Sequence, residues 1–249
     1  TSPLSEWRIF SVYRLDSRFT QHNFTVSIVG CGGTGGFVAE GLCRFLPPHA
    51  ELVLIDHDRV EERNLIRQNF TSCDLGKFKS EALAGRLATR YQRPIAYSNL
   101  PIELAGIRMP GLVIGCVDNG LTRREIARKV TQEISPYSYG WWIDAGNGEN
   151  YGQVIIGNYE IRRLWESFEG EICHALPLPT IQRPELLQQR PREPSCAEAL
   201  AQNEQSPVIN QAIASLVLEM ARRLIEGSCP WVQLYLDLDT GTLTPVMAT

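Results

Sequence analysis

Apolar residues in this chain occur in short runs of strand length, separated by stretches in which they recur at helical spacing. The apolar runs lie at 24–29, 52–55, 94–98, 112–116, 141–145 and 153–157. The helical stretches lie between them at 33–46, 76–91 and 121–133, and a longer one follows at 207–227. This alternation predicts an α/β fold with a doubly wound, mostly parallel sheet.

The alternation of strands and helices does not extend to three segments of the chain. Two late runs, 231–236 and 242–246, predict an antiparallel C-terminal extension in the form of a hairpin. Residues 159–195 are rich in proline, have no long periodic pattern and are expected to form a crossover loop. Residues 1–22 are expected to form an N-terminal arm, with a short helix packed on the sheet edge. No repeat or clear boundary divides the chain, so we predict a single domain over 1–249.

A glycine-rich turn follows the first apolar run. Gly30, Gly32 and Gly35 have the G-x-G-x-x-G spacing, and a helix is expected to begin near Gly33. Glycines let the backbone approach a phosphate closely, and the helix N-terminus offers free N–H groups to it. Asp56 ends the next strand, where Rossmann-like folds carry a carboxylate that binds ribose hydroxyls. The pattern predicts a nucleotide site, and a tight turn without a ligand is the alternative.

Four further polar residues are what an ATP site requires. Asn64 and Arg67 lie in the polar segment 57–75, which is longer than an ordinary connection and is therefore expected to be functional. Arg67 offers a planar fork and Lys79 a point charge to phosphate oxygens. Asp118 follows a buried run and offers a hard oxygen ligand to Mg²⁺. Arg67, Lys79 or Asp118 alone would be interpreted as a solvated charge, so the prediction depends on the set.

Composition excludes several other classes of protein. The net charge of −4 and the lack of a Lys/Arg block give no reason to expect a nucleic-acid partner. No apolar run is long enough to span a membrane, so no membrane partner is expected. The seven cysteines are widely spaced and form no C-x-x-C pair. Thiols in a reducing cytoplasm are therefore expected, without a paired zinc site.

Five short motifs occur in order along the first half of the chain. They are SIVGCGGTG at 27–35, IDHDRV at 55–60, NLIRQ at 64–68, GKFK at 76–79 and CVDN at 116–119. This ordered set resembles the signatures of the ThiF/MoeB/HesA ubiquitin-activating-enzyme-like adenylyltransferase superfamily. A later segment, PSCAEA at 194–199 followed by Gln205 and Asn210, resembles the ThiF-type proteins of bacterial plasmid-associated, PRTRC-like gene clusters.

The resemblance implies an activity, a partner and a set of site residues. Members use ATP and Mg²⁺ to adenylate the C-terminal carboxylate of a small β-grasp ubiquitin-like or sulfur-carrier protein. By position, Asp56 would hold the ribose and Asp118 would position Mg²⁺. The phosphates would contact Asn64, Arg67 and Lys79, and the nucleotide site would also include Gly30, Gly32, Gly33, Gly35, Asp58 and Gln68. A cytoplasmic homodimer is expected, in which Arg14 or Arg18 is the candidate for an arginine lent to the partner subunit.

Many members of this superfamily then transfer the acyl group to a cysteine. Cys173 is the candidate here, because it lies in the crossover loop beside His174, and a reactive thiol needs exposure and a lowered pKa. Cys196 is the second candidate. An ordinary thiol is the alternative for each. Cys31 and Cys116, among others, have apolar surroundings that favour a packing role.

Other functions stay open at this point. The same pocket would serve adenylation of a small molecule, a tRNA base or a peptide. A non-catalytic scaffold like the inactive half of heterodimeric activating enzymes is a further alternative. It is disfavoured because such halves lose the phosphate-binding charges that Arg67, Lys79 and Asp118 retain here. A dinucleotide oxidoreductase is the last alternative, and it has no need of a triphosphate clamp.

Overall fold

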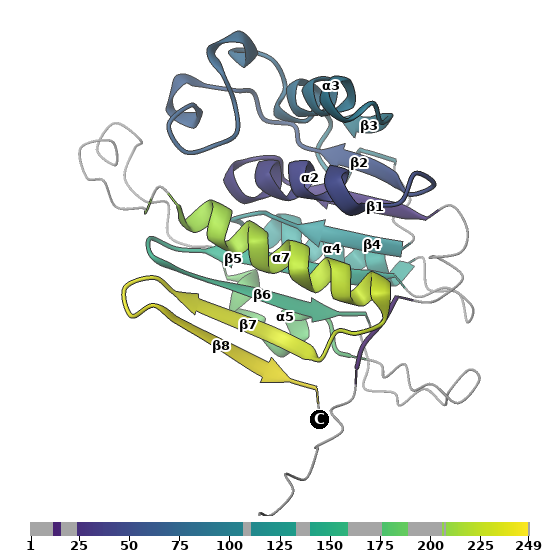
Figure 1. Ribbon diagram of the computed structural model, residues 1–249, viewed down its shortest axis with the longest axis vertical. Coiled ribbons are helices and arrows are strands. Elements are labelled where there is room, and N and C mark those ends of the chain that lie inside the picture. Colours follow the sequence, from purple (N-terminus) through teal and green to yellow (C-terminus); the bar gives the residue numbers. More distant parts are fainter. Residues whose placement is uncertain are drawn as a thin grey trace, which may run out of the picture.

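One eight-stranded sheet organises the part of the chain that the structure, a computed structural model, describes: residues 12–15, 24–106, 111–132, 140–158, 176–188, 206 and 208–248. The strand order is β3-β2-β1-β4-β5-β6-β7-β8 (Figure 1). The chain runs outward from β1 through β2 to β3, and it then returns to the other side of β1 for β4. A doubly wound sheet has its switch point where the order reverses in this way.

The sheet is parallel in its first half and antiparallel in its second. The parallel strands are β1 Thr25–Val29, β2 Glu51–Ile55, β3 Ile95–Ser98, β4 Gly111–Gly115 and β5 Trp141–Asn147. The strands that follow pair antiparallel and are β6 Tyr151–Gly157, β7 Trp231–Asp237 and β8 Thr242–Met247. The predicted fold class, including the antiparallel C-terminal extension, is therefore confirmed.

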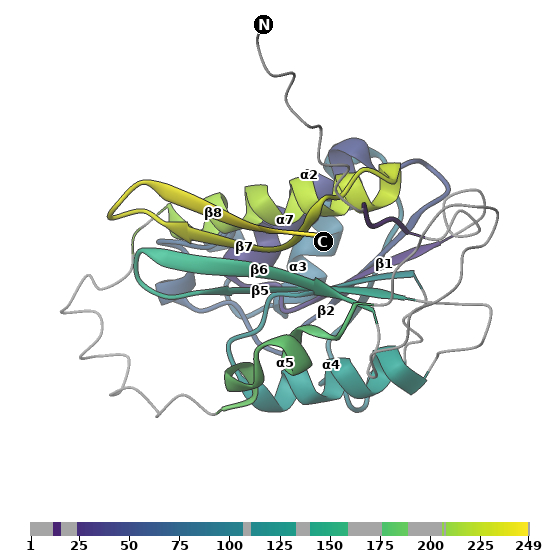
Figure 2. The ribbon, with the colours of Figure 1, turned by 90° about the horizontal axis from the view of Figure 1, so that it is seen from below.

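Helices cover both faces of the sheet. Helices α2 Gly33–Phe45, α3 Lys79–Tyr91 and α7 Ile209–Glu226 share one hydrophobic core with the strands. Helix α4 Gly120–Gln132 and the short α5 Pro179–Gln182 lie on the opposite face (Figure 2). Within the described residues, no helix combines the length and the apolar character that crossing a membrane requires.

The apolar runs are continuous because both faces of each central strand are covered. Side chains of a strand alternate between its two faces. In β2, Leu52 and Leu54 face the α2–α7 side, whereas Val53 and Ile55 face α4. The neighbouring strands β1, β4 and β5 divide their buried side chains in the same manner. This two-sided burial fixes the positions of the strand ends, where the polar residues gather.

Some local predictions were wrong in detail. Helix α3 begins at Lys79 rather than at residue 76, since Gly76 has a φ of +79° and the backbone at Phe78 is extended. The crossover loop 159–195 is not free of regular structure, because its described part contains α5 and the 3₁₀ turn η3 Pro184–Leu187.

The N-terminal arm also differs from the predicted short helix where it is described. Residues 12–15 are extended, because the backbone of Tyr13 forms an antiparallel bridge with Cys229. The N–H of Leu15 donates to the carbonyl of Leu224, 2.7 Å away. This short stretch of the arm is therefore anchored at the C-terminal end of α7.

Candidate functional site

A cavity of about 570 Å³ lies at the carboxyl ends of the central strands β1, β2, β4 and β5. Its size is that of a typical small-molecule pocket, and its place is the switch point of the sheet. It is lined from several segments by Gly30, Gly32, Gly33, Thr34, Asp56, His57, Asp58, Arg67, Gln68, Lys79, Ile102, Val117, Asp118, Arg123, Gly146, Asn147 and Asn210, among others. Most of the residues singled out from the sequence therefore share one cavity.

At Gly30 and Gly35 the glycine turn is packed too tightly for a side chain. Gly30 has a φ of +90°, and a Cβ added to it would lie 2.4 Å from the carbonyl oxygen of Cys116. A Cβ on Gly35 would lie 1.9 Å from the carbonyl oxygen of Gly30, so Gly35 allows the helix to pack against the strand without lining the cavity. No side chain caps α2 at Gly32. The first N–H groups of the helix, which have no partner within it, are thus at the cavity wall.

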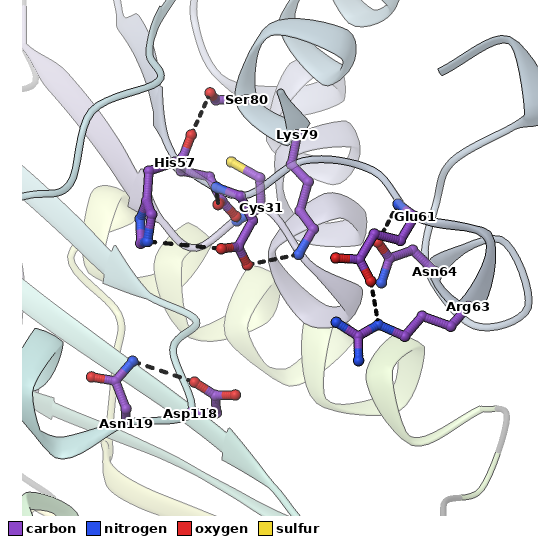
Figure 3. A network of polar contacts seen from close by, with 11 residues as sticks. Cys31, His57, Glu61, Arg63, Asn64, Lys79, Ser80, Asp118 and Asn119 are labelled. Carbon is purple, nitrogen blue, oxygen red and sulfur yellow. Dashed lines mark hydrogen bonds and ion pairs between the residues drawn. The ribbon is translucent and has the colours of Figure 1, made fainter. Parts of the chain in front are cut away.

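Asp56 braces this turn from the end of β2. One carboxylate oxygen accepts the N–H of Cys31 at 2.6 Å, and the other accepts the N–H of Asp58 at 2.8 Å. Burial raises the pKa of Asp56 above its ordinary value, and these two backbone hydrogen bonds oppose the rise. The Ser80 hydroxyl donates to the carbonyl oxygen of Asp56 (Figure 3). Contacts from the glycine turn, from the backbone of Asp58 and from α3 therefore fix the position of Asp56 at the cavity.

Lys79 brings an ammonium group to the cavity from the start of α3. Its Nζ lies 2.9 Å from a carboxylate oxygen of Asp58, and its backbone N–H donates to the carbonyl of the same residue (Figure 3). The Lys79 side chain is 10% exposed, whereas that of Asp58 is 56% exposed. The lysine is therefore held by the fold, while its carboxylate partner faces solvent.

Arg67 and Gln68 line the cavity from the segment between the 3₁₀ turns η1 Glu62–Asn64 and η2 Ser72–Asp74. Arg86 holds this segment by donating to the Asp74 carboxylate at 2.6 Å and to the carbonyl of Asn69. Asn64 is buried but is absent from the cavity lining. Its side-chain oxygen instead accepts the N–H of Glu61 at 2.8 Å, so a contact from Asn64 to phosphate stays a prediction.

Asp118 and Asn119 follow β4. Asn119 caps α4 by accepting the N–H of Thr122 at 2.8 Å, and its amide donates to the Asp118 carboxylate at 3.4 Å (Figure 3). Asp118 is exposed within the cavity lining. Magnesium sites at phosphates commonly use one or two protein carboxylates and complete the shell with phosphate oxygens and water. The donor at Asp118 fits that requirement.

A second group of oxygen and nitrogen donors lies across the cavity from Asp118, at the end of β2. The ligand atoms of Asp56, His57 and Asp58 all lie within 4.8 Å of one another. Asp118 does not belong to this group within the described residues. This group lies next to Lys79, so its oxygen and nitrogen atoms are hydrogen-bond acceptors beside the Lys79 ammonium group.

The cysteines divide into those the structure describes and those it does not. Cys173, His174 and Cys196 lie outside the described residues. Burial raises the pKa of both Cys31 and Cys116, which is the reverse of what a reactive thiol requires. The predicted packing role agrees with the burial of Cys31, whereas Cys116 is half-buried and lines the cavity.

Asn210, at the start of α7, is a cavity residue to which the sequence assigned no role. Its side-chain oxygen accepts hydrogen bonds from the Thr34 hydroxyl at 3.2 Å and from the Asn147 amide at 3.0 Å. Its own amide donates to the backbone carbonyl of Arg67 at 3.4 Å. The signal that was available is a polar residue on the apolar stripe of a helix, between Ile209 and Ile213, where a buried amide must have partners.

Arg123 and Asp144 form a buried ion pair that the sequence analysis also missed. Nε of Arg123 lies 3.0 and 3.1 Å from the two carboxylate oxygens of Asp144. The Arg123 side chain is 7% exposed and that of Asp144 is fully buried. The available signal was an aspartate inside the apolar run 141–145, because a buried carboxylate requires a cation or several donors.

Together, the doubly wound sheet and the cavity at its switch point define a Rossmann-like α/β protein with a binding site at the strand ends. Comparison with known families narrows this class. A family model of the ThiF family matches residues 7–230, and the chain belongs to that family.

The curated relatives carry one common description. Ubiquitin-like modifier-activating enzyme 5 of Drosophila pseudoobscura pseudoobscura is 30% identical over 156 residues, which are 56% of this chain and 37% of that protein. Its counterpart in Branchiostoma floridae is 28% identical over 164 residues, or 58% of this chain and 38% of that protein. The chain thus spans little more than a third of the length of these relatives.

Solved structures share the fold. MccB of E. coli superposes with a TM-score of 0.63 at 19% identity, covering 90% of this chain and 62% of that one. MccB solved with ATP gives a TM-score of 0.61 at 17% identity, covering 93% and 64% of the two chains. PaaA gives 0.62 at 17% identity, covering 94% and 75%.

Proposed function

We propose that the protein is an ATP-dependent adenylyltransferase that activates the C-terminal carboxylate of a small ubiquitin-like or sulfur-carrier protein. The observation that carries the proposal is the convergence of Arg67, Lys79 and Asp118 on one cavity with the glycine turn. A guanidinium, an ammonium and a carboxylate that can bear Mg²⁺ are what a nucleoside triphosphate requires. Membership of the ThiF family and the curated activating-enzyme relatives support the same reaction.

Five cavity residues that the sequence singled out have proposed roles. Asp56 binds the ribose through lone pairs that its two backbone hydrogen bonds leave available. Arg67, Gln68 and Lys79 bind phosphate oxygens, together with the N-terminus of α2. Asp118 bears Mg²⁺, which when bound neutralises phosphate charge.

The proposed reaction joins two anions. An oxygen of the substrate carboxylate attacks the α-phosphorus of ATP, the bond to the bridging oxygen of pyrophosphate breaks, and pyrophosphate leaves with the electron pair. No proton transfer is needed, since the carboxylate is already ionised. The residues therefore have to align the reactants and neutralise charge rather than supply a base.

The finer parts of the proposal concern what surrounds this step. Transfer of the acyl group to Cys173 would follow as a thioester, with AMP as the leaving group. The homodimer and the cytoplasmic location belong to the same proposal, and the cysteines in the described residues, all of them free thiols, support the location.

A second candidate is adenylation of another acceptor in the same cavity, such as a peptide. One structural relative favours retaining it: MccB is described as a microcin C7 biosynthetic enzyme and was solved in complex with N-formylated MccA. The two candidates share the nucleotide site and differ only in the acceptor. Substrate trials therefore separate them.

Exchange of labelled pyrophosphate into ATP tests the leading proposal. The purified protein, Mg²⁺, ATP and a β-grasp carrier that ends in glycine should give exchange that depends on the carrier. Lys79→Met should abolish the exchange, whereas Lys77→Met should retain it, since Lys77 is exposed and outside the cavity. Asp118→Asn and the surface control Asp239→Asn form a second matched pair. Exchange that is absent with every carrier encoded beside the protein would refute the carrier as substrate.

A further inference from the structure

The buried pair of Arg123 and Asp144 uses little of the hydrogen-bonding capacity of the arginine. A guanidinium has five N–H donors in a planar fork. Asp144 takes only the Nε donor, although the usual strong pairing of arginine with a carboxylate is bidentate and involves an Nη atom. Within the described residues, neither Nη atom of Arg123 has a hydrogen-bond acceptor in range. The two Nη atoms of this nearly buried cation are thus available to donate hydrogen bonds to another group.

Nη2 of Arg123 lies at the cavity wall. Arg123 and Gly146 both line it. A Cβ added to Gly146 would lie 3.3 Å from Nη2 of Arg123, so the missing side chain leaves that nitrogen open to the cavity. Asp144, by contrast, is not part of the lining. The Asp144 carboxylate thus holds the guanidinium on the side away from the cavity, and the edge of the guanidinium that has no acceptor faces the cavity.

Arg123 reaches the cavity from the face of the sheet opposite to the phosphate-binding cations. Lys79 begins α3, and the backbone of Arg67 is bonded to Asn210 at the start of α7. Helices α3 and α7 share one core, whereas Arg123 lies on α4, which covers the other face (Figure 2). The strand order puts β5, with Gly146, three strands from β2, roughly 14 Å at the usual spacing. The cavity therefore has cations on two sides.

Two sets of cations match two anions. The triphosphate and the substrate carboxylate repel one another, so bringing them together requires counter-charge on each side of the contact. The α3–α7 side supplies Lys79 and Arg67 for the phosphates. The α4 side supplies one guanidinium with two parallel donors, which is the geometry that a carboxylate accepts.

We propose that Arg123 binds the substrate carboxylate through its Nη atoms, and that Asp144 is a positioning residue that fixes the guanidinium through Nε. This inference rests on the proposed adenylation and assigns the acceptor half of the site. A phosphate oxygen is the other anion that would fit the same donors. The experiment therefore has to separate carboxylate binding from nucleotide binding.

The probes are N-acetylglycylglycine and its C-terminal amide, which differ only in the carboxylate charge. Each is titrated into the full chain with Mg²⁺ and the non-hydrolysable analogue AMPCPP present, and binding is followed by NMR shifts. The wild type should prefer the acid by about tenfold or more, as one charge-assisted hydrogen-bonded pair gives. Arg123→Met should reduce that preference to within about twofold, with the Kd for AMPCPP unchanged. A structural role alone would not remove the distinction between acid and amide.

Gly146→Ala provides a variant that keeps the ion pair. The new methyl group crowds Nη2 and the end of the Gln153 side chain, which is 3.1 Å away and can move. It should weaken acid binding and leave amide binding unchanged. If Arg123→Met fails to fold, this variant carries the test by itself.

The outcomes are distinct. Retention of the acid preference in Arg123→Met, or in Gly146→Ala when only that variant folds, overturns the inference. Loss of AMPCPP affinity by tenfold with the acid preference intact also overturns it and assigns Arg123 to phosphate. A wild type that binds AMPCPP without distinguishing acid from amide refutes the inference but leaves the nucleotide site standing. A wild type that does not bind AMPCPP refutes the proposed function itself.

Discussion

The buried carboxyl of Asp144 should make the stability of the protein depend on pH in an unusual direction. Burial raises its pKa from 3.8 to about 6, and the attraction of Arg123 only partly offsets that rise. Because the folded state holds the proton more tightly than the unfolded state, the contribution of this group to stability is complete below pH 4. It is lost as the pH rises through 6. Most carboxylates show the opposite dependence.

The magnitude follows from the two pKa values. Between pH 4.5 and pH 7, titration of Asp144 should lower the free energy of unfolding by about 2 kcal/mol. Glu219, whose pKa is lowered to about 2 chiefly by hydrogen bonds from Arg222, changes charge below this window and does not mask the effect. Asp144→Asn removes the titration and retains an acceptor for Arg123. Urea unfolding of both proteins at half-unit pH steps gives the difference directly.

The difference between wild type and Asp144→Asn is the quantity to examine, because every other group titrates in both. The free energy of unfolding of the wild type, taken relative to that of Asp144→Asn, should decline steadily from pH 4.5 to 7. A flat difference would mean that the attraction between Arg123 and the carboxylate balances the cost of burial, and a difference that grows with pH would mean that it outweighs that cost. The description of Asp144 as a penalised buried charge would then be wrong.

Three other variants test separate parts of the structure. Arg93→Met should lower the free energy of unfolding by about 1–3 kcal/mol in urea, because the guanidinium donates to the carbonyls of Leu46 and Pro47, both at 2.8 Å, and of Ala50, beyond the end of α2. Lys79→Met should weaken AMPCPP binding by about tenfold or more in calorimetry, because a charged phosphate contact is lost. Asn210→Ala should weaken AMPCPP binding by a few fold and lower stability by about 1 kcal/mol, since it releases the Arg67 backbone.

Each variant has a counterpart that should behave like the wild type. Arg90 lies in the last turn of α3, and Arg93 follows the end of that helix. The Arg90 side chain is 61% exposed, so Arg90→Met should change stability little. Equal losses in Arg90→Met and Arg93→Met would contradict the role of the three carbonyls. Lys77→Met serves Lys79 in the same way, and unaltered AMPCPP binding by Asn210→Ala would show that Arg67 does not depend on it.

The fold was predictable because its information is local. A run such as 52–55 is apolar at every position, which indicates a strand covered on both faces, and it is followed at once by Asp56. The glycine turn follows its strand directly and opens the next helix, an order that every strand–turn–helix unit of this kind repeats. Much of the cavity lining was predictable for a related reason, since carboxyl ends of parallel strands share an edge, although Gly35 and Asn64 do not line the cavity.

The rest depends on contacts that no local pattern specifies. Arg123 is one charge on an amphipathic helix, and only the packing of α4 against β5 brings it to Asp144. Asn210 contacts Thr34, 176 residues away. The start of α3 was misjudged because the turn at Gly76 is stabilised by neighbours, with its N–H donating to the carbonyl of Val60. Contacts between segments that are separate in the sequence could therefore not be predicted from hydrophobic periodicity and motif spacing.

The brace that Asp56 forms has a consequence for mutagenesis and for ligand binding. Both carboxylate oxygens accept backbone N–H groups, so the protein's own hydrogen bonds hold the glycine turn in one shape. Such preorganisation spares an incoming nucleotide the entropy loss of ordering that loop. Replacing Asp56 by alanine would consequently deform the loop as well as remove a ligand contact, and the measured loss of affinity would be the sum of the two.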